Sequence, residues 1–168
     1  MSTPRAQDRL QPALLDRLTD DNPDSQAEGT ESRVINRNRL RDLVLRDLAW
    51  LMNSTAPGGS IDCGHARHAR ASVLNYGLPA LSGETASTVD PMVLQASVRQ
   101  AILDFEPRIL PDSLLVEAVL SEDQMDRHNQ IGFRISGQLW AQPVPLELLL
   151  RTDLDLETGH VVVRELDR

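Results

Sequence analysis

The sequence predicts an α+β fold in which two main helices pack on a small antiparallel C-terminal β-sheet, preceded by an N-terminal arm. Two segments, 34–53 and 91–106, carry apolar residues at the three- and four-residue spacing of an amphipathic helix. From residue 113 onward, apolar residues alternate with polar ones, which is the pattern of half-buried strands. Helices followed by a run of strands indicate a sheet with helices on one face.

The first helix is predicted from a single buried stripe. Ser32 is its expected N-cap, and the segment 53–59, rich in glycine and small polar residues, is expected to end it. The stripe consists of Leu40, Val44, Leu48 and Leu51, with Leu43 beside it.

The second helix has clear signals at both ends. Asp90 is the expected N-cap, and Pro91 suits the first helical position. Pro107 disfavours helical geometry at Glu106, so the helix is expected to end there. Its apolar stripe consists of Leu94, Val98, Ala101, Ile102 and Phe105. Between the two helices, residues 60–90 are predicted to be irregular, with an extended segment at 72–79 that ends in a turn at Gly77.

Strands are predicted in the C-terminal third, at 113–120, 131–139, 146–157 and 161–163. Short connections between the last strands favour an antiparallel meander. Acidic side chains on the third strand and its turn either face solvent or limit uncontrolled pairing at the sheet edge; they are Glu147, Asp153, Asp155 and Glu157.

Residues 1–33 are predicted to form an arm ahead of a single domain at 34–168. A short helix is expected in the arm, with Leu14, Leu15 and Leu18 on one face, before an acidic and turn-rich linker. Short apolar segments on linkers can dock on partner proteins. The arm helix is therefore either a partner-binding segment or a helix folded back on its own domain.

The first helix is strongly basic. Five arginines against the single acid Asp42 lie between residues 33 and 46; they are Arg33, Arg37, Arg39, Arg41 and Arg46. Such a face is either solvated and balanced by nearby acids or an interface for an acidic partner.

Composition restricts the class of protein. A chain of 168 residues suits one domain with short extensions, and its net charge of −8 argues against broad nucleic-acid binding. The single cysteine, Cys63, permits no intramolecular disulfide, which fits a reducing compartment. The N-terminus lacks a secretory signal, and no run approaches the roughly 20 apolar residues of a membrane span. We expect a cytoplasmic protein with protein partners, no cofactor and no small-molecule substrate.

The sequence offers little for catalysis or metal binding. Cys63, His65 and His68 have poor spacing for a structural zinc site, so no metal is expected. We find no glycine-rich phosphate loop, no H-E-x-x-H and no nucleophile elbow. An enzyme is therefore not expected.

The tripeptide Glu106-Pro107-Arg108 forms a stiff corner after the second helix. Pro107 fixes the backbone, so the two charged groups can be presented at low entropic cost. Arg108 suits a bidentate contact with a partner's carboxylate. The alternatives are an internal pair that pins the helix to the sheet, and an Arg108 that caps its own helix.

Three elements of the sequence resemble a known family. They are SVLNYGLP at 72–79, a helix ending in FEPRI at 105–109, and the strand-rich C-terminus. These resemble the gpW and gene-25-like family of phage baseplate wedge proteins, and within it the TssE subunits of type VI secretion systems. PALLDRLTDD at 12–21 also looks like the N-terminal part of TssE proteins.

The resemblance implies a structural baseplate wedge component that joins the wedge core to the first ring of a contractile sheath and templates sheath assembly. The implied partners are other wedge subunits and sheath subunits. Glu106, Pro107 and Arg108 are then the residues used in assembly contacts.

Two alternatives to this function remain open at the level of sequence. One is a generic cytoplasmic adaptor with the same fold. The other is a lysozyme-like glycoside hydrolase, which needs two carboxyl groups facing each other across the scissile bond. Glu106 is the only acid that suits this role, and no second acid stands out as its partner.

Overall fold

The computed structural model describes residues 13–19, 35–59, 65, 67–70, 72–80, 89–119, 130–141 and 144–166. The helices are α1 (Leu14–Leu18), α2 (Arg37–Met52), α3 (Arg67–Arg70) and α4 (Pro91–Phe105). The strands are β1 (Leu115–Val119), β2 (Gln130–Leu139), β3 (Leu146–Asp155) and β4 (Val161–Glu165). Short 3₁₀ turns occupy Pro57–Gly59, Val73–Asn75 and Pro111–Ser113. The predicted α+β fold with two main helices is confirmed.

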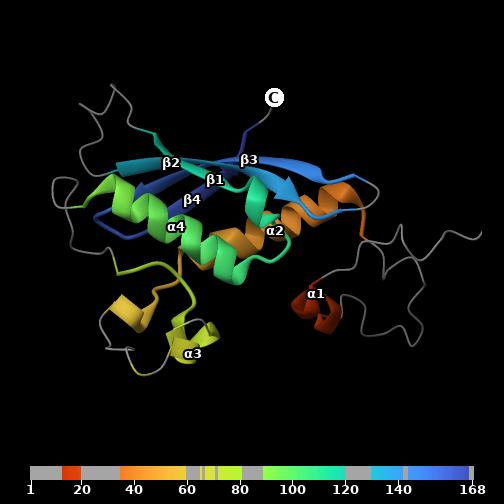
Figure 1. Ribbon diagram of the computed structural model, residues 1–168. Coiled ribbons are helices and arrows are strands. Elements are labelled where there is room, and N and C mark those ends of the chain that lie inside the picture. Colours follow the sequence, from red (N-terminus) through yellow and green to blue (C-terminus); the bar gives the residue numbers. More distant parts are fainter. Residues whose placement is uncertain are drawn as a thin grey trace, which may run out of the picture.

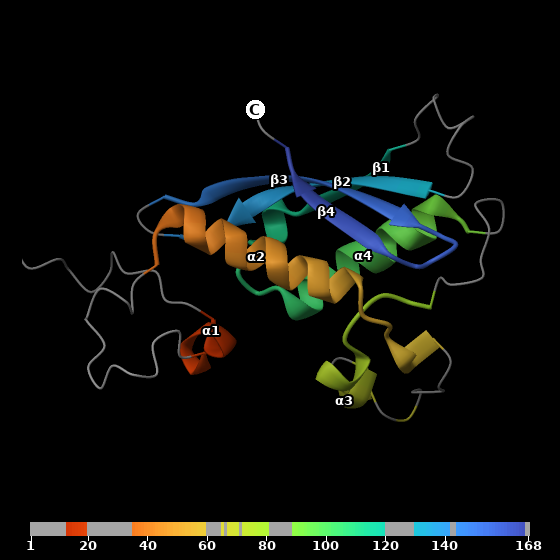
Figure 2. The ribbon, with the colours of Figure 1, turned by 180° about the vertical axis from the view of Figure 1, so that it is seen from behind.

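The sheet and the two main helices form two layers. Figure 1 shows α2 and α4 lying across one face of the sheet, and Figure 2 shows the same arrangement from behind. The helices α1 and α3 lie on the side of this helical layer that faces away from the sheet. No described helix lies over the opposite, outer face of the sheet.

The sheet is an antiparallel meander, as the short connections predicted. Its strand order is β1-β2-β3-β4, so β1 and β4 are the edges. The alternation of the sequence decides which side chains of each strand face the core, because one face of each strand must be buried. On β3, the buried residues Leu148, Leu150, Thr152 and Leu154 alternate with more exposed ones.

The helix α2 begins later than predicted. Asn36 is the N-cap, and its side-chain oxygen accepts a hydrogen bond of 2.7 Å from the backbone N–H of Arg39. Residue 34 and the predicted cap Ser32 lie outside the described residues. Asparagine caps a helix as well as serine does. Because the side chain of Asn36 satisfies the free N–H of Arg39 in the first turn, the helix begins at Arg37. The predicted stripe is confirmed as buried: Leu40, Leu43, Val44, Leu48 and Leu51.

The helix α4 begins as predicted. Asp90 accepts a hydrogen bond of 2.8 Å from the backbone N–H of Met92, and Pro91 is the first helical residue. The side chain of Gln95 accepts a hydrogen bond of 2.9 Å from the backbone N–H of Ala118 in β1. This bond ties α4 to that edge of the sheet.

The core lies between the helices and the sheet and is aliphatic apart from Phe133. Asn53, at the C-terminus of α2, joins this helix to the edge strand β4. Its side chain donates to the carbonyl of Val161 at 2.8 Å and accepts from the N–H of Val161 at 3.0 Å. Both backbone groups of Val161, at the start of the edge strand β4, are thereby satisfied.

The segment 72–80 differs in part from the prediction. Its first half is the 3₁₀ turn Val73–Asn75 instead of extended chain, because the hydroxyl of Ser72 accepts a bond from the N–H of Leu74 and caps the turn. The predicted turn at Gly77 is present, with φ of 123°. Leu78 then exchanges backbone hydrogen bonds with Ser54 at 2.9 Å and Ala56 at 2.7 Å. Among the described residues, no helix is long and apolar enough to cross a membrane.

A substitution at Gly77 tests the close approach of this segment to the backbone of Ser54. A Cβ atom at position 77 would lie 2.2 Å from the carbonyl oxygen of Ser54, at a φ that L-residues avoid. We expect Gly77→Ala to lower the free energy of unfolding by at least about 2 kcal/mol in urea denaturation.

The matched control is Gly132→Ala. Its Cβ would meet only ordinary contacts, the nearest at 3.6 Å. This substitution is expected to leave stability unchanged or to raise it by about 0.5 kcal/mol. Equal losses for the two variants would contradict the account.

Candidate functional site

The corner after α4 is held to the sheet by the backbone. Glu106 is the C-cap of α4, and its N–H donates to the carbonyl of Ile102 at 2.8 Å. Beyond Pro107, the carbonyl of Arg108 accepts from the N–H of Trp140 at 2.7 Å, and the N–H of Leu110 donates to the carbonyl of Gln138 at 2.8 Å. These bonds fix the corner to the end of β2.

Within this corner, Glu106 and Arg108 form an internal ion pair. The two carboxylate oxygens of Glu106 accept from Nε of Arg108 at 2.7 Å and from Nη2 at 2.5 Å. The backbone N–H of Arg108 donates to the same carboxylate at 3.2 Å. Glu106 is only 4% exposed. A carboxylate this buried requires a cation beside it, and Arg108 supplies one from two residues away.

Asp47 of α2 also binds Arg108, although it is 61 residues away in the sequence. Its Oδ2 lies 2.6 Å from Nη2 of Arg108. Burial opposes the charge of Arg108, but the hydrogen bonds and negative charges of Glu106 and Asp47 outweigh burial and raise the pKa of Arg108 above its ordinary value. The arginine thus stays charged and pins the end of α4 to α2.

The same network reaches the arm helix through Arg46. Arg46 donates to Asp47 at 2.7 Å and 2.9 Å and binds Asp16 of α1 at 2.5 Å and 3.3 Å. Its guanidinium lies 4.7 Å from the centroid of the Trp50 ring, within cation–π range. The hydrogen bonds from Arg46 lower the pKa of Asp16, against the opposing effect of burial. Five side chains therefore alternate in charge from the corner to the arm: Glu106, Arg108, Asp47, Arg46 and Asp16.

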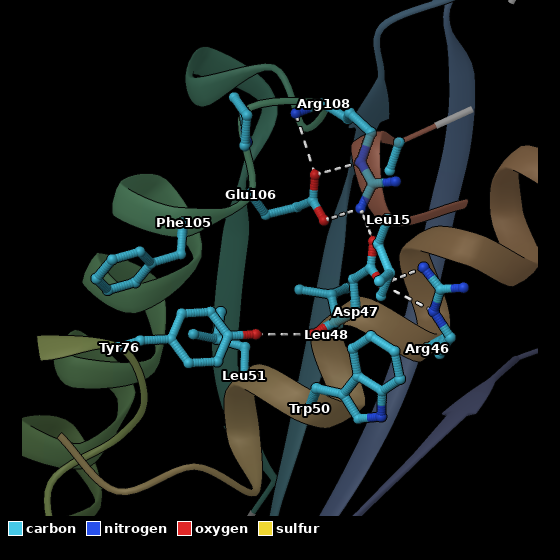
Figure 3. A pocket seen from close by; sticks show the side chains of 12 residues that line it. Leu15, Arg46, Asp47, Leu48, Trp50, Leu51, Tyr76, Phe105, Glu106 and Arg108 are labelled. Atoms are coloured by element: carbon cyan, nitrogen blue, oxygen red, sulfur yellow. Dashed lines mark hydrogen bonds and ion pairs between the residues drawn. The ribbon is translucent and has the colours of Figure 1, made fainter. Parts of the chain in front are cut away.

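These residues border a groove of about 460 Å³. Figure 3 shows the charged network along the top and right of the groove, with Tyr76 and Phe105 at its left. Tyr76 and Phe105 meet edge-to-face there, with ring centroids 5.2 Å apart. Its lining comes from α1, α2, the segment around Tyr76 and the corner: Ala13, Leu15, Arg46, Asp47, Leu48, Trp50, Leu51, Tyr76, Phe105, Glu106, Pro107 and Arg108.

The groove brings together the two sets of candidate residues that the sequence had left separate. Leu15 of the arm is 50% exposed and lines the groove with Glu106, Pro107 and Arg108. Leu18 is 74% exposed, and the side chain of Leu14 lies outside what the structure describes. The structure has α1 against its own domain, and the role of these residues in partner binding stays a prediction.

Sequence reasoning missed the residues that join these parts. Nothing in the pattern around Asp47 or Asp16 marks them as links between elements, because Arg108 is 61 residues from Asp47 and Arg46 is 30 residues from Asp16. Arg46 was visible only as one member of the basic helix. Within that helix, Arg41 also donates to the carbonyl of Glu147 at 3.2 Å and lies 3.7 Å from Glu165. Balance by acids of the same chain therefore accounts for these two arginines.

The arrangement gives no support to hydrolysis or metal binding. Both carboxylate oxygens of Glu106 are occupied by N–H donors of Arg108, whereas a general acid must present its proton to a substrate. Within the described residues, no group of three or more histidine, cysteine, aspartate or glutamate side chains is placed to hold a metal ion. Cys63 of the sequence motif lies outside the described residues.

The buried ion pair predicts a large cost for removing one partner. Arg108→Met keeps much of the side-chain volume but leaves Glu106 buried without its cation. We expect this variant to lose about 2–4 kcal/mol of unfolding free energy in urea denaturation. The double variant Glu106→Leu/Arg108→Met, in which the pair is absent, should recover part of that loss. A loss below about 0.5 kcal/mol in the single variant is the size expected of an exposed ion pair. It would contradict the dependence of buried Glu106 on Arg108.

The docking of α1 is predicted to depend on pH. Since the pKa of Asp16 is lowered from its ordinary 3.8, its contribution is complete above that value and is lost as the pH falls through the lower folded value. We expect the emission of Trp50, measured in a Trp140→Phe background, to change below about pH 4. Asp16→Asn should show the acid spectrum at neutral pH. An unaltered acid transition in Asp16→Asn would assign it to another group.

The family comparison covers the centre of this site. The sequence profile of a family described as baseplate wedge protein gp25 matches residues 38–144, from α2 to the residues just after β2. No curated protein and no solved structure matches the sequence. The matched segment contains Asp47 and the Glu106–Arg108 corner and spans more than half of the 168 residues. The chain therefore belongs to the gp25 family of baseplate wedge proteins.

Proposed function

We propose that this chain is a structural wedge component of a contractile type VI secretion machine that works in the cytoplasm. In this proposal it links the wedge core to the first sheath ring and templates sheath assembly. Membership of the gp25 family supports a baseplate role, and the resemblance to TssE supports the type VI machine. The observation that carries the proposal is the groove, because the motif corner and the arm helix line it together.

The groove suits a partner segment with an apolar side and an oxygen acceptor. Trp50 is 49% exposed there and supplies apolar area, and Pro107 is exposed at the rim. Arg108 is held in place by Glu106 and Asp47, yet its Nη1 is a buried donor with no hydrogen-bond partner within the described part of the chain. We assign the contact to Pro107 and Arg108, and to Glu106 the task of holding Arg108.

Displacement of the arm helix would let a partner reach Nη1 of Arg108. In the proposal, residues 1–33 act as an arm on a domain at 34–168, and the arm helix yields its place on the groove to a partner. Its described side-chain anchor is the Asp16–Arg46 pair, and its apolar residues Leu15 and Leu18 are largely exposed. Leu14, Leu15 and Leu18 then become partner contacts, which is one of the two alternatives that the sequence leaves open.

The edge strand β4 is the proposed template for the sheath. Asn53 already satisfies Val161. In an antiparallel pair the outward backbone groups belong to every second residue, so those of Val163 and Glu165 face the same side as those of Val161. A sheath strand can add at this edge, and each added strand presents a further edge. At the opposite edge strand, β1, the N–H of Ala118 already donates to the side chain of Gln95.

Co-expression with the wedge and sheath subunits of the same gene cluster tests the groove. The wild-type chain is expected to capture wedge subunits. Arg108→Ala and Leu15→Asp, once shown to be folded by circular dichroism, should reduce capture by about tenfold or more, as for an arginine hot spot. Arg99→Ala is the matched control, because Arg99 is an exposed arginine of α4 that does not line the groove.

The outcomes separate the function from the site. Capture by the wild type and by all folded variants would keep the baseplate role but remove the groove from it. Failure of the wild type to capture any wedge or sheath subunit, with every chain folded, would contradict the proposal and favour the generic adaptor.

A further inference from the structure

The outer face of the sheet carries a row of arginines that do not line the groove. Arg134 of β2 is paired in register with Arg151 of β3, and Arg151 with Arg164 of β4. Glu117 of β1 lies opposite Arg134 and ends the row. All four residues are exposed, and they lie on the face opposite the buried residues Val116, Phe133 and Leu150.

This row opposes the stability of the sheet. Like charges directly opposite each other on neighbouring strands are destabilising, and strands lie only about 4.8 Å apart. Asp153 offsets part of the charge, since it lies 3.2 Å from Nε of Arg151. No ion pair joins Arg134 or Arg164 to another residue in the part of the chain that the structure describes. Glu117 opposite Arg134 and Asp153 beside Arg151 offset part of the repulsion, and charge pairing within the described sheet leaves Arg164 without an acidic partner.

The rows on either side are largely apolar. Leu115 is 51% exposed and lies in the same row as Ser136 and Leu149. On the other side, Val119 and Val162 lie in the row of Gly132 and Asp153. The outer face is thus amphipathic, with a cationic row between two apolar margins, and no described helix covers it. Arginine beside apolar side chains is typical of protein interfaces.

We propose that this arginine row docks an acidic helical segment of a partner protein. Acidic residues at positions i, i+4 and i+7 of a helix lie along one face about 5–6 Å apart, which matches the strand spacing of about 4.8 Å. A helix lying across the strands can therefore present one carboxylate to each of Arg134, Arg151 and Arg164. The guanidinium fork suits such carboxylates. The inference stands apart from the groove and goes beyond the proposed function.

The chemistry favours a protein partner over a nucleic acid. Glu117 and Asp153 border the row, and the chain carries a net charge of −8. These charges oppose any polyanion, so the apolar margins decide the class of partner, because a phosphate backbone has no apolar side to place against them. A helix with acids on one face and apolar residues beside them meets the arginines and the apolar margins together.

A pair of synthetic helical peptides tests the proposal on the full chain. One peptide carries glutamates at i, i+4, i+7 and i+11 on a single face, and the other carries the same residues distributed around the helix. Fluorescence anisotropy is measured at low salt and at 150 mM NaCl. We expect the single-face peptide to bind with a Kd at least about tenfold lower, as three added surface ion pairs imply.

Variants assign the binding to the row. Arg134→Gln/Arg151→Gln/Arg164→Gln should lose that preference, whereas Arg37→Gln/Arg70→Gln/Arg99→Gln, with the same loss of charge from exposed arginines elsewhere, should keep it. Equal binding of the two peptides, equal losses in the two triple variants, or tighter binding of a single-stranded oligonucleotide of equal charge would each overturn the proposal.

A stability measurement checks the premise separately. Arg164→Thr removes one repulsive pair and places a residue that favours strands. We expect its urea midpoint to equal or exceed that of the wild type. A lower midpoint would show that Arg164 serves the fold and would contradict the premise.

Discussion

The ion pair between Glu106 and Arg108, extended to Asp47, is the interaction on which the rest of the site depends. A carboxylate that is 4% exposed at a helix end is stable only with its cation in place. By binding Asp47 at 2.6 Å, the same cation joins the corner to α2. Arg46 continues the alternation of charge to α1. One network thus joins the end of α4, a wall of the groove and α1.

This arrangement gives the molecule two separate sides. The helix α1 lies on the helical side, away from the sheet, and the outer face of the sheet lies on the other side (Figure 1). The groove is lined by α1, α2, the segment around Tyr76 and the corner. The edge strand β4 borders both. A wedge component that holds two neighbours needs contact surfaces that do not compete for the same residues. In this chain the groove and the arginine row share no residue, whereas Arg164 of the row belongs to the edge strand β4.

The fold could be predicted because its signals are local. Burial repeats along α2 and α4 with the helical period and along the strands with a period of two, so both element types follow from the spacing of apolar residues. The start of α2 was missed because Asn36 and Ser32 are both good caps. The roles of Asp47 and Asp16 could not be predicted, since the contacts Asp47–Arg108 and Asp16–Arg46 join residues that are distant in sequence. The arginine row depends on the register of three strands, which alternation alone does not give.

Photo-crosslinking within the assembled wedge tests most directly whether the groove docks a partner. Trp50 and Trp140 are similarly exposed, at 49% and 55%, but only Trp50 lines the groove. Each is replaced in turn by a photoreactive benzoyl-phenylalanine, and the variants are assembled with the wedge and sheath subunits of the same gene cluster. The account predicts a cross-link to a wedge subunit from position 50 and a much weaker one from position 140. A cross-link from position 140 alone would place the partner elsewhere and contradict the account.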